Sequence, residues 1–276
     1  MEAPATLPDD AAIAAVPLPT YAAAMAVAYG CCYALAKTCL RQAPCVAVAG
    51  DAIFGLVYYP LLFVLALDAS FDLYADATLR WTGTTSTSVV LGKLLVSRMV
   101  VHMPYIFLKR SREEVELRPM YVVHHCIVIV AYGAGVARSL SHFWGAAAAL
   151  CEATNVFLTV DELLLSAPGV RARPWLAAPQ RWLQRGFKAA YVVFRLVLFP
   201  CILATMARDV RAMAPADYAR LGPFELVVFP AAVLFVFGLS VSWAVTALRP
   251  DPRAPPDAPA LPVTSPRGHP SGAKTN

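Results

Sequence analysis

Two adjacent histidines, His124 and His125, lie inside an apolar run of the sequence. A neutral imidazole near pH 7 can act as a general base or as an acyl acceptor, so this pair is the first candidate for catalysis. Three more polar side chains lie at a similar depth, roughly 9 to 10 Å from the cytosolic ends of their own apolar runs if each residue adds about 1.5 Å to a helix. We expect these three to bind a substrate: Asp51, His102 and Arg195.

Each of these groups has a preferred chemistry. An arginine suits the phosphate or carboxylate of a lipid head group, so Arg195 is the expected head-group ligand. Neighbouring residues on a helix point about 100° apart, so the two histidines cannot comfortably serve one small site. At least one member of the pair is therefore open to a second interpretation, as a packed, hydrogen-bonded bystander.

A second polar layer lies deeper in the same apolar runs. Lys93 and Glu152 fall about 20 to 22 Å from the cytosolic ends of their runs, and Arg98 and Asn155 fall at about 15 Å. An ionisable side chain in hydrocarbon costs about 2.5 to 3.5 kcal/mol on insertion scales, so these groups should face the interior of a helix bundle. We expect Lys93 to pair with Glu152. Because buried ion pairs often fix helix register, we interpret the four residues as structural polar pairs.

Several classes of chemistry find no support in the sequence. Membrane enzymes that hold two metal ions need several histidine boxes, and this chain has one His-His pair besides isolated histidines at 102, 142 and 269. A retinal protein needs a lysine in its last span, and residues 223–248 contain none. The sequence has no P-loop, GxSxG or CxxC motif. We therefore expect neither a metal nor a cofactor.

The elements that carry these residues must be membrane-spanning helices. Apolar residues make up 59% of the 276-residue chain and charged residues 15%, and the mean hydropathy is +0.58, so most of the surface must face lipid. The sequence predicts an all-α polytopic transmembrane bundle of about seven spans. The expected spans are 18–36, 43–67, 84–108, 119–137, 142–165, 189–207 and 223–248.

The loops between these spans predict an orientation. Of the 23 Lys and Arg residues, 15 fall in the loops after the first, third and fifth spans and in the C-terminal segment, and five fall on the opposite side. Because cytosolic loops carry the excess of basic residues, the N-terminus should be luminal and the C-terminus cytosolic. We expect a short luminal tail over 1–17, a transmembrane domain over 18–248 and a disordered Pro-rich cytosolic tail over 249–276.

Three segments, in this order, resemble one known family. They are MYVVHHCIVIVAYG at 120–133, CEATNVFLTVDELLL at 151–165 and FKAAYVVFRLVLFP at 187–200. Their counterparts in the TLC-domain family, which includes the ceramide synthases, are a His-His pair opening a span near the cytosolic side, a Glu-containing segment in a later span and an Arg before Phe-Pro. Here the matching positions are His124 with His125, Glu152 through Leu158, and Arg195 before Phe199 and Pro200.

The resemblance also has departures that bear on activity. Ceramide synthases similar to this module continue after the His-His pair to a His-Asp dipeptide in the next span, and this sequence contains no His-Asp. It also lacks the homeobox-like insertion common among animal synthases. The resemblance therefore favours the non-synthase branch, whose members are linked to phospholipid and sphingolipid composition and, in one case, to cargo export from the endoplasmic reticulum.

The resemblance implies a TLC-like bundle in the endoplasmic reticulum or a related endomembrane, acting in lipid homeostasis. It implies a lipid-accepting cavity that opens toward the cytosolic leaflet, with membrane lipids and other membrane proteins as partners and no nucleic acid. Two alternatives stay open. One is a non-catalytic cargo receptor or regulator of a lipid enzyme. The other is a diverged N-acyltransferase that uses acyl-CoA as co-substrate, so the residues leave open whether the protein is an enzyme.

Overall fold

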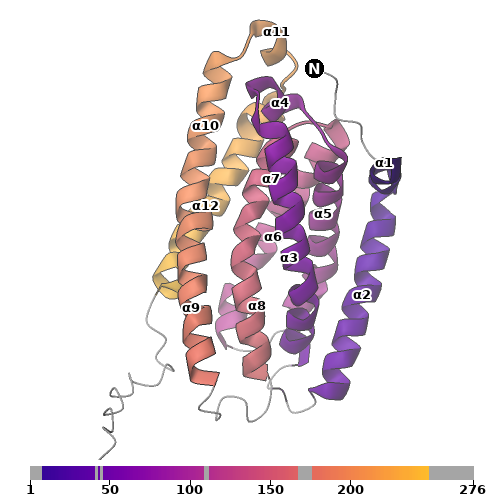
Figure 1. Ribbon diagram of the computed structural model, residues 1–276, viewed down its shortest axis with the longest axis vertical. Coiled ribbons are helices and arrows are strands. Elements are labelled where there is room, and N and C mark those ends of the chain that lie inside the picture. The colour runs from indigo at the N-terminus through magenta and orange to yellow at the C-terminus, as the bar shows by residue number, and fades with distance from the viewer. Residues whose placement is uncertain (1–7, 41–42, 44–45, 109–111, 167–175, 249–276) are drawn as a thin grey trace, which may run out of the picture.

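The described part of the chain folds into a bundle of long helices (Figure 1). The computed structural model describes residues 8–40, 43, 46–108, 112–166 and 176–248. Seven helical segments of this part are long and apolar enough to cross a membrane, as the sequence predicts. They cover Leu18–Cys39, Val46–Tyr74, Ala77–Ile106, Arg118–Arg138, His142–Leu164, Ala178–Ala212 and Phe224–Val245.

The helices are named here in their order along the chain. The first half contains α1 (Pro8–Ala15), α2 (Leu18–Cys39), α3 (Val46–Tyr74), α4 (Ala77–Thr82), α5 (Ser86–Ile106) and α6 (Arg112–Arg138). The second half contains α7 (His142–Ala149), the short η1 (Leu150–Glu152), α8 (Ala153–Ser166), α9 (Ala177–Tyr191), η3 (Val192–Val197), α10 (Leu198–Ala212), α11 (Pro215–Tyr218), η4 (Phe224–Val228) and α12 (Phe229–Ala247). The segments η3 and η4 are π-helical, and each continues directly into the α-helix that follows.

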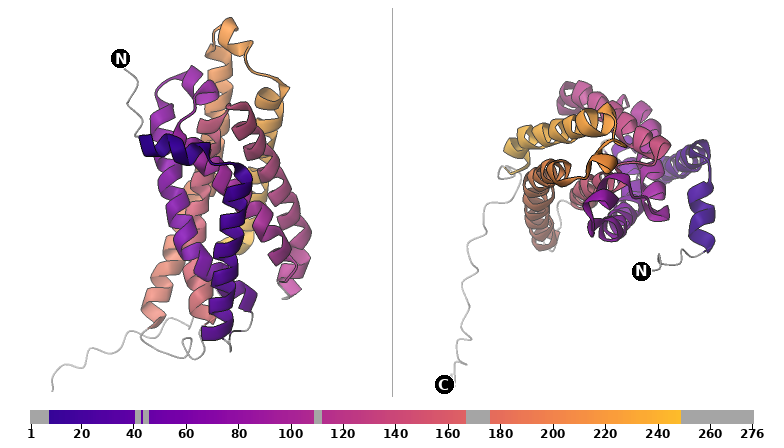
Figure 2. Two further views of the ribbon diagram at one scale, coloured as in Figure 1. Left: turned by 90° about the vertical axis from the view of Figure 1, so that its right-hand side faces the viewer. Right: turned by 90° about the horizontal axis from the view of Figure 1, so that it is seen from above.

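The long helices run roughly along the vertical axis of Figure 1. We call the end that carries α4 and α11 the upper end, and the end where α2 finishes and α9 begins the lower end. The chain enters through α1, which lies crosswise at the outer side of the bundle, near the upper end of α2 and against α5 (Figure 2), and α12 finishes toward the lower end. The two ends of the described chain therefore lie on opposite sides, as an odd number of crossings requires.

Several helix boundaries differ from the sequence prediction, and the second span, for example, ends at Tyr74 rather than at 67. Residues 8–15 form α1 within the segment expected to be a tail. The short α4 precedes the third span, capped by the Asp76 side chain, which accepts from the backbone N–H groups of Thr78 and Leu79. The sixth span starts at 178 rather than 189 and has 35 residues, about 52 Å of helix against a hydrocarbon core of about 30 Å. The first turns of this helix, before residue 189, contain polar residues. They are helical although an interpretation based on apolar residues alone starts the span at 189. The expected tail over 249–276 lies outside the described residues.

Helix α3 lies at the centre of the packing and contacts α2, α5, α7 and α8. Its glycines permit two close approaches. A Cβ at Gly50 would lie 3.0 Å from the backbone of Tyr33 in α2, and a Cβ at Gly55 would lie 2.7 Å from the hydroxyl oxygen of Thr159 in α8. A first buried cluster joins α3 to α2, α5 and α7 around Tyr29, and a second joins α7 to α10 and α12.

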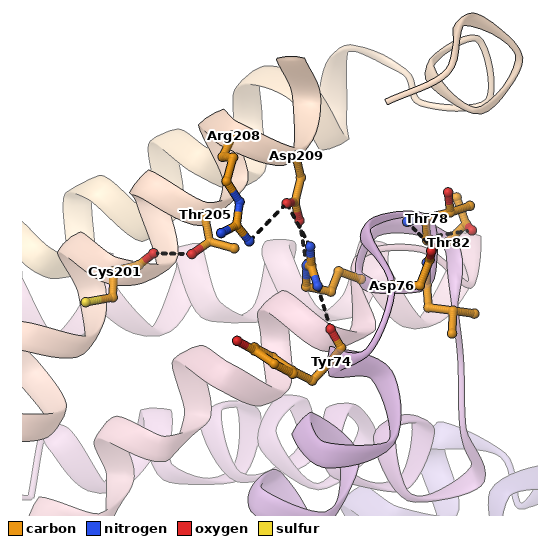
Figure 3. Close-up of polar contacts among 10 residues, drawn as sticks. Tyr74, Asp76, Thr78, Thr82, Cys201, Thr205, Arg208 and Asp209 are labelled. Carbon is orange, nitrogen blue, oxygen red and sulfur yellow. Dashed lines mark hydrogen bonds and ion pairs between the residues drawn. The ribbon is translucent and has the colours of Figure 1, made fainter. Parts of the chain in front are cut away.

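Two bidentate ion pairs close the upper end. Arg80 of α4 binds Asp209 of α10 through Nε to Oδ2 at 2.6 Å and NH2 to Oδ1 at 2.8 Å. Figure 3 shows Asp209 above the turn that follows Tyr74. Arg138, at the end of α6, binds Glu225 of η4 at 2.6 and 3.1 Å. Planar two-point contacts of this kind fix orientation as well as distance, so both late helices are held at their upper ends.

Candidate functional site

A buried polar network joins α2, α3 and α5 toward the lower part of the bundle. Asp51 of α3 accepts a hydrogen bond of 2.6 Å from the Tyr29 hydroxyl of α2 and another, on the same oxygen, from Arg98 NH2 of α5. Its second oxygen, Oδ2, lies 3.3 Å from Nε2 of His102. The carboxylate therefore links three helices. Its contact with His102 agrees with the expectation that Asp51 and His102 lie in one layer.

His125 of α6 extends this network to a fourth helix. Its Nε2 lies 3.0 Å from Nδ1 of His102, and the two rings stack with centroids 5.2 Å apart. Its Nδ1 lies 2.8 Å from the backbone carbonyl oxygen of Tyr121, one turn earlier in α6. Both nitrogens of His125 are thus engaged within the protein. This placement agrees with the expectation that one histidine of the pair is packed and hydrogen-bonded.

Aromatic rings surround the guanidinium of the network. Arg98 is 2% exposed, and its Cζ lies 5.0 Å from the ring centroid of Tyr29, 5.2 Å from that of Phe54 and 5.9 Å from that of Tyr58. Aromatic faces carry partial negative charge and attract a cation. The rings and the Asp51 carboxylate together explain how an arginine can be buried at this position.

His124 faces a different place from its neighbour. It lines a partly open cavity of about 50 Å³ between α5, α6, α7 with η1, α10 and α12. Its Nδ1 is buried and has no hydrogen-bond partner among the described residues. Its ring lies 6.4 Å from that of Trp243 on α12, whose indole nitrogen is buried and has no hydrogen-bond partner in the described part of the chain either. The wall of the cavity is otherwise apolar over much of its area, with Val128, Phe199, Val233 and Val236 among its residues.

Glu152 provides the acidic group of this cavity. The Asn155 side-chain amide donates a hydrogen bond to Glu152 Oε2, as their spacing of three residues on one helix face predicts. Cys151, beside it, also lines the cavity, and its thiol is 3.8 Å from Glu152 Oε1. The cavity thus holds an imidazole, a carboxylate and a thiol in an otherwise apolar setting.

Arg195 lies in η3 and is buried against α8. Its Nε donates a 2.9 Å hydrogen bond to the Thr154 hydroxyl of α8. The π-helical η3 carries it, and a π-turn inserts one extra residue per turn, which rotates side chains relative to an ordinary helix. The expected single layer of five residues therefore divides into three parts. Asp51, His102 and His125 form one network, His124 lines the cavity, and Arg195 binds Thr154 outside the set of residues that line the cavity.

The expected ion pair between Lys93 and Glu152 is wrong. Lys93 Nζ instead donates hydrogen bonds to the backbone carbonyls of Ala14, at 2.5 Å, and Val16, at 2.8 Å, at the end of α1. The two residues have similar depth, but α5 turns Lys93 toward α1, while Glu152 faces the cavity. A lysine at the C-terminal carbonyls of a helix is a favourable alternative partner, because these carbonyls lack intrahelical donors. Arg98 likewise forms an ion pair with Asp51 rather than with a group on the fifth span.

Sequence reasoning missed several residues that shape this region. Tyr29 and Trp243 carry no charge and lie in ordinary apolar runs, so no signal in the sequence singled them out. Thr154 lies inside the Glu152–Leu158 segment that carries the resemblance, but no role was assigned to it there. Within the described ranges, no group of three or more His, Cys, Asp and Glu side chains has the arrangement of a metal site.

Comparison with known proteins gives one match. A family model described as the TLC domain matches residues 48–249, which include every residue of the network and the cavity named above except Tyr29. No curated protein matches the chain, and no solved structure matches it.

Proposed function

The chain belongs to the TLC-domain family, and from this premise we propose that it influences the phospholipid or sphingolipid composition of its membrane by binding a lipid at the cavity beside His124. The family is generally concerned with lipids, and seven apolar helices make the chain an integral membrane protein. The observation that carries the proposal is the cavity itself. It places an unpartnered imidazole and a carboxylate inside an apolar chamber, as an amphiphile with a polar group and an acyl chain requires.

The proposal assigns separate roles to the two histidines. His124 is the group that meets the lipid, and in a chemical step it acts as general base or acyl acceptor. His125 has both ring nitrogens engaged, so it holds α6 in register with α5 instead. Arg195, buried beside Thr154, supplies the positive charge for a phosphate or carboxylate. We place the protein in the endoplasmic reticulum or a related endomembrane, with its lower end in the cytosol.

The size of the cavity favours a second candidate. About 50 Å³ holds only one or two water molecules at about 30 Å³ each, whereas pockets for small ligands measure about 300 to 1,000 Å³. Lipid binding on the first proposal therefore needs α12 to move away from α6. The second candidate is a non-catalytic cargo receptor or regulator of a lipid enzyme, in which the cavity stays closed and the surface of the bundle recognises a partner.

One experiment separates the two candidates. Cells lacking the protein are complemented with the wild type, with His124→Ala, or with Cys126→Ala as a matched control on the lipid-exposed face of the same helix. The lipidome is then measured by mass spectrometry at equal protein levels. The first proposal predicts that deletion changes acyl-chain or head-group composition, that Cys126→Ala restores it and that His124→Ala does not. An unchanged lipidome after deletion contradicts it. Full rescue by His124→Ala favours the non-catalytic candidate.

The catalytic form of the proposal has its own test. Purified protein in phospholipid bilayers is incubated with acyl-CoA and a sphingoid base, and the amide product is measured. An N-acyltransferase produces the amide with the wild type and loses it with His124→Ala. No amide above the level of protein-free bilayers removes this version while leaving lipid binding in place.

A further inference from the structure

The first turns of α9 extend beyond the apolar part of the sixth span. The whole helical segment, Ala178–Ala212, has 35 residues, and its apolar run covers 189–207. At about 1.5 Å per residue this run is about 28 Å long, close to the hydrocarbon thickness of about 30 Å. Residues 178–188 therefore leave the hydrocarbon at the lower end of the bundle, where α9 begins (Figure 1).

Arg185 of α9 lies at the level of the lipid head groups. It precedes residue 189 by four positions, which places its Cα about 6 Å outside the hydrocarbon along the helix axis. The head-group region on each side of a bilayer is about 5 to 8 Å thick. Trp182 lies on the same side of the helix, about one turn further out. The two side chains therefore lie in the region that holds the phosphate groups of the surrounding leaflet.

A cation–π contact on the surface joins these two side chains. Trp182 is 70% exposed, and Arg185, also exposed, has its Cζ 5.5 Å from the ring centroid of Trp182. A ring that packs against one face of a guanidinium leaves its N–H groups at the edge of the plane, where they can donate to two oxygens of one phosphate. An indole, with an apolar body and one N–H group, is suited to the boundary between hydrocarbon and water. The pair therefore presents donors for a phosphate beside a tryptophan that anchors the helix at this boundary.

The charge of α9 is complementary to an anionic head group. Its 15 residues, AAPQRWLQRGFKAAY, include three basic residues and no Asp or Glu. Arg181 precedes Arg185 by about one turn, so the two guanidinium groups can reach one ligand. The acidic groups of α8, which packs against α9, are Asp161 and Glu162. Both are partly buried and have partners, and Asp161 Oδ1 accepts a hydrogen bond of 3.3 Å from Gln180. The outward face of α9 is therefore positively charged.

We propose that Arg181, Trp182 and Arg185 form a surface site that binds the phosphate head group of an anionic phospholipid from the leaflet at the lower end of the bundle. The site does not depend on the proposed lipid chemistry, because none of its three members is among the residues that line the cavity. A lipid bound here fixes the depth at which α9 enters the membrane, and α9 continues directly into η3, which carries Arg195.

The test measures the lipid affinity of the full-length protein. The chain is purified in a neutral detergent and titrated with palmitoyl-oleoyl phosphatidylglycerol, or with the phosphatidylcholine of the same acyl chains, and bound lipid is counted by native mass spectrometry. An arginine near an anionic lipid surface contributes about fivefold in affinity. Two arginines should therefore give the wild type a preference of roughly 25-fold for phosphatidylglycerol. Equal affinity for the two lipids would overturn the proposal.

Variants locate this preference on α9. Arg185→Gln should lower it about fivefold, and Arg181→Gln with Arg185→Gln should remove it. Trp182→Leu keeps both charges and should lower it about two- to fivefold. Arg208→Gln is the matched control, because the Arg208 side chain is 68% exposed but lies on α10 near the upper end, and its loss should leave the preference unchanged. All four side chains are at least partly exposed, so each variant should fold, which circular dichroism checks.

Three results with the variants would overturn the proposal. They are a preference of wild-type size in the double variant, a preference of wild-type size in Trp182→Leu, and an equal loss of preference in Arg208→Gln. The last of these would mean that the net positive charge of the whole chain, rather than this face of α9, attracts the anionic lipid. If a variant fails to fold, the comparison of the two lipids on the wild type still decides.

Discussion

Replacing Asp209 with asparagine should destabilise the protein strongly. The Asp209 carboxylate is 2% exposed and Arg80 is 7% exposed, and two hydrogen bonds of 2.6 and 2.8 Å join them. Asp209→Asn keeps the shape of the side chain but leaves the guanidinium buried without its counter-charge. Breaking a buried pair from one side costs about 3 to 5 kcal/mol. At about 2 to 4 °C per kcal/mol for a chain of this order of size, the melting temperature should fall by roughly 6 to 20 °C.

The assay is thermal unfolding of the detergent-purified full-length chain, followed by circular dichroism. Arg208→Gln is the matched control, because Arg208 also approaches Asp209, at 3.6 Å, but its side chain is 68% exposed. An exposed pair contributes about 0 to 1 kcal/mol, so this control should melt close to the wild type. The double variant Arg80→Met with Asp209→Leu removes both charges and should recover part of the loss. The reasoning is refuted if Asp209→Asn melts like the wild type, or if the double variant is less stable than the single one.

Three further predictions concern helix contacts. Gly55→Ala should cost about 1 to 3 kcal/mol, because its methyl group would press on Thr159; Gly133→Ala, with nothing within 4 Å, should instead gain up to about 1 kcal/mol in the same melting assay. Lys93→Met should speed amide exchange of α1 in hydrogen-exchange mass spectrometry, since it removes two hydrogen bonds to the end of that helix, and unchanged exchange would contradict this contact. The stability lost in Glu152→Gln should not be recovered by adding Lys93→Gln, because the two side chains do not form an ion pair. Recovery of stability in the double variant would be evidence that they do.

The number of spans could be predicted because it depends on a one-dimensional property. An apolar run of about 20 residues is long enough to cross a bilayer wherever the helix is placed in the bundle. The same reasoning misjudged the start of the sixth span. Residues 178–188 are polar, with Arg181 and Arg185 among them, and they extend an apolar helix beyond the length that the bilayer requires. Helix continuity is decided by backbone hydrogen bonds, not by hydropathy.

The partners of the polar residues could be predicted only in part. Helix rise gives the depth of a side chain, and depth alone correctly suggested that Asp51, His102 and His125 could meet. It gives no information on rotation about the helix axis or on which helices are neighbours. Lys93 and Glu152 have matching depths but face different helices, so their expected pairing was wrong.

The division between the two histidines has the same origin. Their separation of about 100° around the helix predicted that they would not share one small site. Which of them meets the cavity depends on where α12 packs against α6, and no local feature of the sequence contains that information. The contact of aromatic rings with Arg98 could not be predicted for a similar reason, because Tyr29 and Phe54 look like ordinary members of apolar runs.

The most direct test of the account is whether a lipid reaches the cavity beside His124. The full-length protein is reconstituted with a phospholipid that carries a photoactivatable diazirine in its acyl chain, illuminated, and cross-linked residues are identified by mass spectrometry. The account predicts cross-links at Val128 and Val236 of the cavity wall, and their loss in Ala232→Trp, which fills the cavity. Cross-links confined to outward-facing residues such as Val130 and Val241, unchanged in Ala232→Trp, would contradict it.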